Sequence, residues 1–455
     1  MEYLTCTKIL NIMTVLGFMA NYMLRVNLSI AVVDMLDTNA TTQVQRFNWD
    51  VEQRNTLLGA FFWGYMIPTI LGGRLSETLG PRLIFGGGML TASIVTVLQP
   101  ATCYIHFYLA VAARVALGMC LGVTYPAIGP LAVKWIPPSN RSKFMAHMLA
   151  QGLGVAVSLP VCGLLISCFG WPSVFYCTGL LGLTWSCLWF YLVYDSPASH
   201  PRISPEERQE IESQMGPVQT VSDKPQKMPW GQILLSLPAW AVIVAHSFIA
   251  YCQFMNITQL PTYLRDVFAF DIQQNGLLSS LPNLGQYCAA ILAGFCADKI
   301  RKSDRLSTLA TRKLFASLTC FVPAILTLML IWWGRSVTVA MFFMTTSISL
   351  IGFMSAGHLP NCLEISPNFC GTIMGIATAI SSIAGWLATK TVAIVTKDDS
   401  SINSWNTVFI IMVVVYTSGG LFFVLFADGN VQKWNSNKKE DDKEERKSLN
   451  VKIEC

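Results

Sequence analysis

Two arginines lie inside long apolar stretches of this 455-residue chain. Arg25 is in the stretch 9–35, and Arg114 is in the stretch 105–133. A guanidinium keeps its charge at physiological pH, and holding one at bilayer depth costs about 2.5–3.5 kcal/mol on insertion scales. Asp34 is the nearest acid in the first stretch, but it lies about 13 Å further along a helix, too far for a direct ion pair. We therefore expect the two arginines to serve a buried, water-accessible site for an anion.

The composition is that of a membrane protein. Hydrophobic residues make up 53% of the chain and charged residues 13%, whereas soluble domains have about 25% charged residues. The charges gather in a few loops, and the stretches between them are long enough to cross about 30 Å of hydrocarbon as helices. We predict an all-α membrane protein with twelve transmembrane helices. The predicted spans are 9–36, 56–76, 83–102, 105–132, 144–168, 172–194, 236–262, 274–297, 312–333, 337–362, 370–396 and 405–427.

A proline-rich, charged interruption, 195–235, divides the spans into six and six. The predicted parts are an N-terminal half (1–194), this linker, a C-terminal half (236–427) and a tail (428–455). Lysines and arginines gather in the loops on the side of the linker, which places the linker and both termini in the cytoplasm. The net charge of +5 reflects this bias and gives no reason to expect nucleic acid as a partner.

The start of the chain and its cysteines carry weaker signals. The first apolar stretch is too long for a cleavable signal peptide, and the segment before it has no acidic dileucine signal of the lysosomal type. We therefore expect the plasma membrane rather than a lysosome or vesicle. The fourteen cysteines are scattered through the spans without metal-ligand spacing, so we interpret them as packing residues. We expect no cofactor and no metal site, and we expect a monomer.

A short pattern recurs after the second span of each half. Glu77 and Arg82 stand in GGRLSETLGPR, and Asp298 and Lys299 stand in GFCADK. Glycine followed by an acid and a base at a helix end permits close helix approach and an ion-pair latch. The repeated pattern resembles the signature loop of the major facilitator superfamily. That resemblance implies two six-helix halves around a central cavity.

Further stretches resemble one family of that superfamily: the organic anion and phosphate transporters that include sialin, the vesicular glutamate transporters and the type I sodium–phosphate cotransporters. These stretches are LRVNLS (24–29), GAFFWGY (59–65), GVTYPA (122–127), WIPP (135–138), LPTY (260–263) and GLLSSLP (276–282). The resemblance implies that Arg25 and Arg114 bind a substrate carboxylate or phosphate. It also implies that Tyr22, Tyr65 and Tyr125 line the cavity, where packing is the alternative role for each ring.

Other polar residues of the spans complete the set of candidates. Asn256 and Asn361 are predicted substrate ligands, with a bond to a neighbouring helix as the alternative for Asn256. Glu364, near the cytoplasmic end of the tenth span, is predicted to be a gate or latch residue. For three span histidines a buried, neutral, hydrogen-bonded form is favoured over proton carriage; they are His147, His246 and His358.

The expected driving force comes from departures from the family pattern. Proton-coupled relatives carry Glu in the fourth helix where this chain has Leu121, and several carry His near the position of Gly129. Glutamate carriers have His and Arg where this chain has Leu58 and Ile249. We therefore expect a secondary transporter of small organic anions or phosphate. Sodium or the membrane potential is expected to drive it, with Na⁺ as the candidate co-transported ion.

Alternatives from other classes stay open at this point. One is a proton-coupled exporter of acidic sugars or amino acids, as in sialin, and another is a transport-silent receptor or scaffold with the same fold. A channel is disfavoured because no pore-loop motif or ring of charge is present. An enzyme is disfavoured because no nucleophile–base pairing or metal spacing appears. The expected partners are a small anion and the lipid bilayer.

The loop charges predict the topology. An epitope tag inserted after Ser213 should be accessible from the cytoplasm alone, and Asn39, in Asn-Ala-Thr, should carry a glycan on the other side. Antibody staining of intact and permeabilised cells, with glycosidase digestion, measures both. A tag that stains on intact cells would contradict the orientation.

Overall fold

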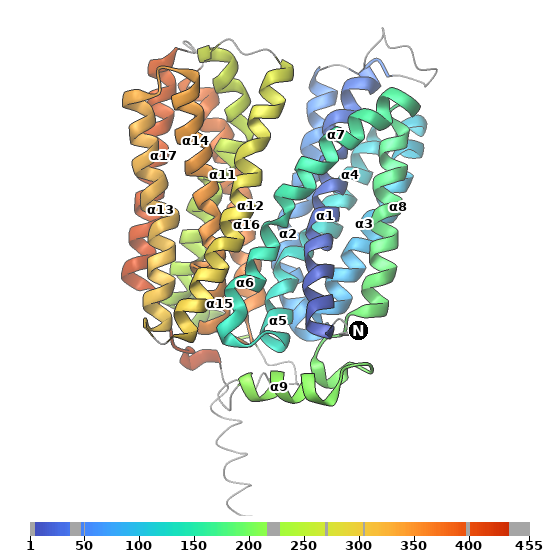
Figure 1. Ribbon diagram of the computed structural model, residues 1–455. Helices are drawn as coiled ribbons and strands as arrows, with labels where there is room; N and C mark the ends of the chain where they lie inside the picture. Colours follow the sequence, from blue (N-terminus) through green and yellow to red (C-terminus); the bar gives the residue numbers. More distant parts are fainter. Residues whose placement is uncertain are drawn as a thin grey trace, which may run out of the picture.

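The computed structural model describes residues 5–36, 47–49, 51–215, 228–268, 272–303, 305–396 and 401–435. Throughout these ranges the regular elements are helices, with no strand. The helices form two bundles that stand side by side, one from each half of the chain (Figure 1). The predicted all-α class and the division into halves both match this arrangement.

The first bundle contains the predicted spans one to six. Its fourth span is broken by a turn at Val123, and its fifth begins with a short helix and a 3-10 turn, His147–Ala150. The helices are α1 (Cys6–Leu36), α2 (Val51–Leu79), α3 (Pro81–Ile105), α4 (Phe107–Gly122), α5 (Thr124–Trp135), α6 (Arg141–Ala146), α7 (Gln151–Phe169) and α8 (Pro172–Leu192).

The second bundle contains the predicted spans seven to twelve. Its fourth span is also broken, by a 3-10 turn at Ile351–Ser355, so the two halves share an interruption at the equivalent span. The helices are α11 (Leu237–Phe268), α12 (Ile272–Lys302), α13 (Thr308–Trp333), α14 (Val337–Leu350), α15 (His358–Ile365), α16 (Cys370–Val395) and α17 (Ile402–Phe426).

Length and hydropathy support membrane insertion for nearly all of these spans. Within the described residues, 11 helices or joined helix pairs are long and apolar enough to cross a bilayer. The remaining predicted span corresponds to α12, whose buried face carries polar residues such as Gln286. Because α12 has 31 residues and packs beside α14 and α7, it has the length and the neighbours of a membrane helix as well. The protein is a multi-pass membrane protein.

The linker is more ordered than its composition suggests. It contains α9 (Pro205–Met215) and α10 (Trp230–Leu234), and α9 lies across one end of the first bundle (Figure 1). Glu207 of α9 accepts the backbone N–H groups of Cys6 and Thr7 at 3.0 and 2.9 Å. A carboxylate at these first N–H groups satisfies donors that α1 cannot pair internally. We call this end of the molecule, predicted to be cytoplasmic, the linker end.

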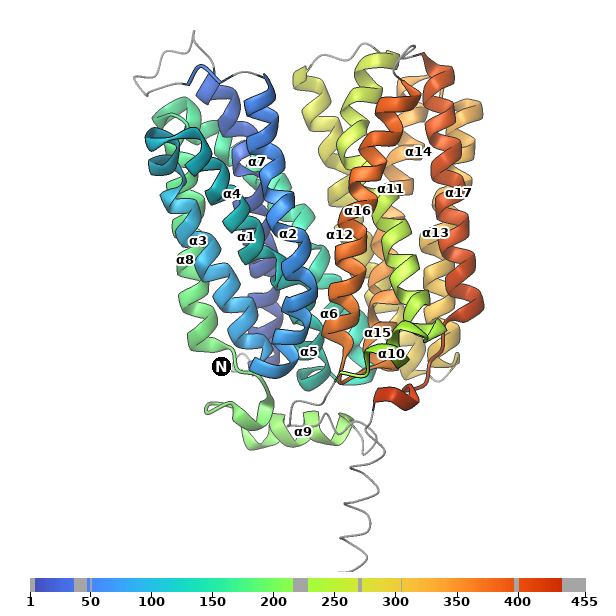
Figure 2. The same cartoon turned by 180° about the vertical axis from the view of Figure 1, so that it is seen from behind.

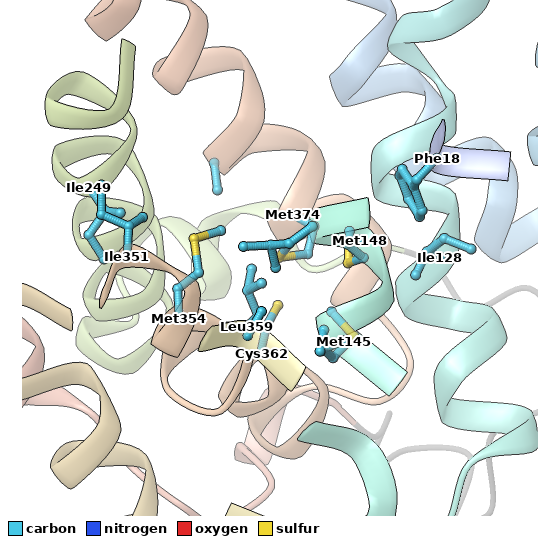
Figure 3. Packing of buried hydrophobic residues seen from close by; sticks show 14 of the residues in the cluster. Phe18, Ile128, Met145, Met148, Ile249, Ile351, Met354, Leu359, Cys362 and Met374 are labelled. Carbon is cyan, nitrogen blue, oxygen red and sulfur yellow. The ribbon is translucent and has the colours of Figure 1, made fainter. Parts of the chain in front are cut away.

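The two bundles come together at the linker end and diverge toward the opposite end (Figures 1 and 2). Helices α2 and α5 of the first half pack on α16, and α6 packs on α12 and α15. Small residues permit this approach: a Cβ on Gly73 of α2 would lie 2.1 Å from the carbonyl oxygen of Gly371 on α16. Buried methionines from both halves fill the space nearby, namely Met145, Met148, Met354 and Met374 (Figure 3).

Glycines also set the distance between α2 and α4 within the first half. A Cβ on Gly118 of α4 would lie 2.1 Å from the carbonyl oxygen of Phe61, and one on Gly64 of α2 would lie 2.0 Å from that of Val115. Small residues at such a crossing allow backbones to touch, which drives helix association in membranes. The close contact fixes where the aromatic residues of α2 stand.

The α2–α4 crossing predicts a stability effect. Gly118→Ala forces the helices apart and should lower the unfolding free energy by about 1–3 kcal/mol, the usual cost of overpacking. The matched control is Gly87→Ala, since a Cβ there meets nothing within 4 Å. Thermal unfolding of the purified proteins in detergent measures both. Equal unfolding temperatures for the two variants would contradict the role given to Gly118.

Candidate functional site

Arg25 on α1 has its guanidinium among aromatic rings. Its Nη1 donates to the hydroxyl of Tyr22, one turn earlier, at 3.3 Å. Its Cζ lies 4.8 and 5.0 Å from the ring centres of Phe61 and Phe62, and 5.2 and 5.6 Å from those of Tyr22 and Tyr65. Each ring face attracts the cation by about 0.5–2 kcal/mol. We call these four rings the aromatic wall.

The charge of Arg25 has no acidic partner in the described part of the chain. The ion pairs found there involve other arginines. Asp34 on the same helix instead accepts the backbone N–H of Trp171 at 3.1 Å. Phe62 is 47% exposed, so part of the aromatic wall lies at the surface of the first bundle. The arrangement thus presents a permanent cation with donors left for an anion.

Arg114 lies elsewhere, in the interior of the first half. It is 2% exposed, its Nη2 donates to Oδ1 of Asn27 at 3.1 Å, and its Cζ lies 5.5 Å from the ring centre of Phe175 on α8. Asn27 follows Arg25 by two residues, about 200° around the helix, so it faces another side of α1. Its Nδ2 donates to Thr178 at 3.1 Å. The structure does not bring Arg114 to the aromatic wall; its contacts join α4 to α1 and α8 inside the first half.

The other predicted ligands are spread over the molecule. Tyr22 and Tyr65 belong to the aromatic wall, whereas the ring of Tyr125 lies 6.0 Å from that of His246 in the second half. Asn256 lines a small pocket inside the second bundle with residues of α13, α14 and α17, so its position does not match a ligand shared between the halves. Asn361 is fully buried near the linker end and donates to the carbonyl of Asp428 at 2.7 Å, which gives it a structural contact instead.

Glu77 at the end of α2 joins the two halves. Its carboxylate accepts the backbone N–H of Thr372 at 2.7 Å and the hydroxyl of Thr372 at 2.8 Å. Arg74 donates to the same carboxylate from one turn earlier at 3.2 Å. Thr372 lies in the first turn of α16, where unpaired N–H groups favour a negative charge. The acid of α2 therefore caps a helix of the opposite half.

Asp298 on α12 makes the equivalent contact in the other direction. Its two carboxylate oxygens accept the backbone N–H groups of Ser142 and Lys143, at 3.3 and 3.0 Å, in the first turn of α6. Gly294, one turn earlier, lies so close that a Cβ there would be 3.0 Å from the backbone of Lys143. The two acids that the sequence pattern singled out thus cap helices across the interface between the halves.

A cluster of buried charge completes the linker end. Glu364 on α15 accepts three hydrogen bonds from Nε and Nη2 of Arg312, the shortest at 2.7 Å, and forms an ion pair with Arg301 at 3.2 Å. Arg312 also donates to the hydroxyl of Ser142 in the first half at 2.7 Å, and Arg301 donates to the carbonyl of Pro138. The sequence indicated Glu364 but missed both arginines, because they stood among other basic residues of one loop. Arg301 and Arg312 differ from the other basic residues of this loop in the helices that they contact, which the residue type does not reveal.

The two bases of the predicted latch do not join the halves. Arg82 contacts the first half and the start of the linker: its Nη2 donates to the carbonyl of Phe190, and its backbone N–H donates to Asp195 at 2.8 Å. The side chain of Lys299 is exposed at the end of α12. Arg301, two residues after Lys299, is the base of this segment that reaches the first half, where it donates to the carbonyl of Pro138. The predicted glycosylation site, Asn39, lies outside the described residues, as does the tail after 435.

Comparison with known sequences places this arrangement in a family. The model of the Major Facilitator Superfamily matches residues 10–389. Sialin of Homo sapiens is 35% identical over 451 residues, covering 94% of this chain and 90% of sialin. Vesicular glutamate transporter 2 of Mus musculus is 32% identical over 436 residues, covering 94% of this chain and 75% of that protein. The chain belongs to the major facilitator superfamily. Within it, the relatives are the anion transporters that its motifs resemble.

Solved structures agree on the fold. The proton:xylose symporter XylE, bound to 6-bromo-6-deoxy-D-glucose, superposes with a TM-score of 0.68 at 17% identity, covering 92% of this chain and 96% of XylE. A bacterial homologue of the iron transporter ferroportin superposes with a TM-score of 0.69 at 12% identity, covering 93% of this chain and 99% of the homologue. The predicted fold, two six-helix halves of a major facilitator, is confirmed.

The capping contact of Glu77 predicts a change in conformation. Glu77→Gln removes the charge that faces α16, and a charge-assisted hydrogen bond is worth about 1.5–3 kcal/mol, so the linker end should open at least about tenfold more often. Maleimide labelling of Cys370, which is fully buried behind this contact, should accelerate accordingly. Peptide mass spectrometry measures the rate.

The control for this variant is Glu212→Gln on α9, whose carboxylate pairs with Arg208 at an exposed position. Cys252, buried inside the second bundle, serves as an internal reference that should label slowly in every variant. Unchanged labelling of Cys370 in Glu77→Gln would show that the contact does not hold the linker end closed.

Proposed function

We propose that this chain is a secondary active transporter of small organic anions or inorganic phosphate, working by alternating access, with Arg25 as the anion ligand. The observation that carries the proposal is the guanidinium of Arg25, which among the described residues has ring faces and one hydroxyl around it and no carboxylate. A cation in an apolar helix is retained where a function requires it. Here the missing partner is the substrate.

The chemistry of the aromatic wall suits a carboxylate or phosphate. The planar fork of arginine can donate two parallel bonds to such a group, which lysine cannot do. Tyr22 accepts a bond from Arg25 through its oxygen, so its own proton remains to be donated to a substrate oxygen. The rings exclude water from the other faces of the charge, which strengthens the contact with an anion.

The contacts between the halves support alternating access. The contacts of Glu77 and Asp298 close the linker end, and the bundles diverge at the other end (Figure 1). Breaking the two capping contacts together would let the halves rock, as in other carriers built from two repeats. Met145 and Met374, flexible side chains on opposite sides of the interface, can repack as it opens.

The driving force is the part of the proposal that depends on the sequence. Leu121 stands where proton-coupled relatives carry an acid, and it is buried in the first half at 1% exposure. Sodium or the membrane potential is then the driving force, provided that no other ionisable group lies where the halves meet. Two further properties stay predictions from the sequence: location in the plasma membrane rather than in a lysosome or vesicle, and a monomeric state. The names of the vesicular relatives do not support the plasma membrane.

Substitution of Arg25 tests the proposal. Arg25→Ala removes a charge-assisted contact worth about 1.5–3 kcal/mol, so apparent affinity for the transported anion should fall roughly ten- to a hundredfold. Arg25→Lys keeps the charge without the fork and should recover only part of it. The measurement is uptake of labelled glutamate, gluconate and phosphate into proteoliposomes, with imposed sodium and potential gradients.

A structural role for Arg25 would give a different pattern. In that case Arg25→Ala would lose folded protein, which size-exclusion chromatography and thermal unfolding detect. Arg114→Ala provides the comparison, since Arg114 bonds to Asn27 in the bundle interior and its loss should lower stability more than anion affinity. If folded Arg25→Ala takes up the same anion with unchanged affinity, the proposed site is wrong. If no anion moves, the receptor alternative is favoured.

A further inference from the structure

Two histidines of the second half bond to each other where the halves meet. Nδ1 of His246 on α11 lies 3.1 Å from Nε2 of His358 on α15. His358 is fully buried, and His246 is 6% exposed. The contact requires one ring nitrogen to donate a proton and the other to accept it, because two lone pairs or two N–H groups facing each other would repel. The pair therefore shares one proton.

The second ring nitrogen of His358, Nδ1, is buried and has no hydrogen-bond partner. If His246 donates within the pair, this Nδ1 carries an unpaired N–H, and if His358 donates from Nε2, it is a bare lone pair. Either form of an unpaired buried group costs about 1–3 kcal/mol. In the second form, which is the starting point of the proposal, the pair holds an empty proton acceptor inside the protein.

The surroundings of the pair are aromatic and nearly free of charge. Tyr125 of α5, in the first half, has its ring 6.0 Å from that of His246, and Phe423 of α17 lies 6.5 Å from His358. The phenol of Tyr125 is the titratable group that faces the pair from the first half. On the other packed helices, α17 has Tyr416 as its one titratable side chain, and α16 has Lys390 near its far end.

Charge does occur on the linker-end side of α15. Arg312 of α13 donates to the carbonyl of Ala356, two residues before His358. Arg312 shares Glu364, which lies further along α15, with Arg301, and buried Arg141 of the first half also lies near this acid, so the cluster already carries positive charge. In the described residues the two histidines take part in no ion pair, so a proton bound there can leave again without breaking one.

We propose that His246 and His358 form a proton-binding site of this carrier. The step is the addition of one proton from water to Nδ1 of His358, which gives an imidazolium that still donates from Nε2 to His246. No bond within the pair breaks. The site lies in the second half, on helices that do not carry Arg25. Proton binding by the pair does not depend on the proposed function, whereas a role of the pair in coupling does.

Rocking of the halves provides the access that such a site needs. Tyr125 belongs to the first half and His246 to the second, so their contact must separate when the linker end opens. Opening on that side must admit water to Nδ1 of His358 itself, because Nδ1 of His246 already accepts from His358 and Nε2 of His246 carries that ring's own proton. In the closed arrangement the rings of Tyr125 and Phe423 cover the histidines. The pair would supply the ionisable group that the fourth helix lacks at Leu121. With it, protons replace sodium as the coupling ion of the proposed function.

Histidine-selective ¹⁵N NMR in lipid bilayers tests the site directly, because the whole chain has five histidines. We expect one imidazole of the pair to gain a second N–H between about pH 8 and pH 5, the range in which histidine changes charge, while its partner stays neutral. Both rings remaining neutral, each with one N–H, over this range would overturn the proposal.

A conservative variant separates proton binding from packing. His358→Gln keeps an N–H that can donate to His246 but has no counterpart of the empty Nδ1, so the extra protonation should vanish while the protein stays folded. His147→Gln is the control, since His147 lies in the first half and packs on Phe144. Persistence of the titration in His358→Gln, with loss in the control, would assign the proton to His147 and refute the pair.

Uptake of labelled glutamate, gluconate and phosphate at clamped membrane potential tests the coupling. An imposed inward proton gradient should raise uptake several-fold in the wild type and in His147→Gln, and not in His358→Gln. Stimulation by sodium alone, or equal proton stimulation in His358→Gln, would overturn the coupling role. If none of these anions moves while the NMR titration is present, the proposed function fails and the proton site stands.

Discussion

The permanent charge of Arg25 is the constraint on which the rest of the first half depends. A guanidinium in an apolar helix cannot lose its proton, so the protein must surround it with groups that tolerate it. The faces of Phe61, Phe62 and Tyr65 do so without supplying an opposite charge. They reach Arg25 because glycines let α2 lie against α4. The cation is stabilised but not neutralised, so the binding of an anion to it would still be favourable.

The same rule, that helix ends accept opposite charge, joins the halves. Glu77 and Asp298 each cap the first turn of a helix in the other half, so the two contacts are related like the halves themselves. Such contacts are strong while formed and break without covalent change, which suits the alternating access that we propose for this interface. The paired histidines lie on the same interface, where the rocking of the halves can control their access to water.

Sequence patterns predicted the fold because hydropathy and loop charge are local properties that the bilayer itself imposes. They also indicated Arg25, as a charge inside an apolar stretch, and Glu77 and Asp298, as the acids of a repeated pattern. They could not place Arg114 against Asn27 or separate Arg301 from Lys299, since these outcomes depend on which face of a helix meets which neighbour. The bond between His246 and His358, 112 residues apart, arises from tertiary packing and leaves no mark in the local sequence.

Counterflow in proteoliposomes tests the central claim, that this chain moves an anion by alternating access, most directly. Vesicles preloaded with unlabelled glutamate, gluconate or phosphate are diluted into a trace of the same labelled anion. The account predicts, for at least one of them, a transient accumulation of label that saturates as the internal concentration rises, because loaded carriers return faster than empty ones. Flux that rises linearly with concentration and shows no stimulation by internal anion would contradict it.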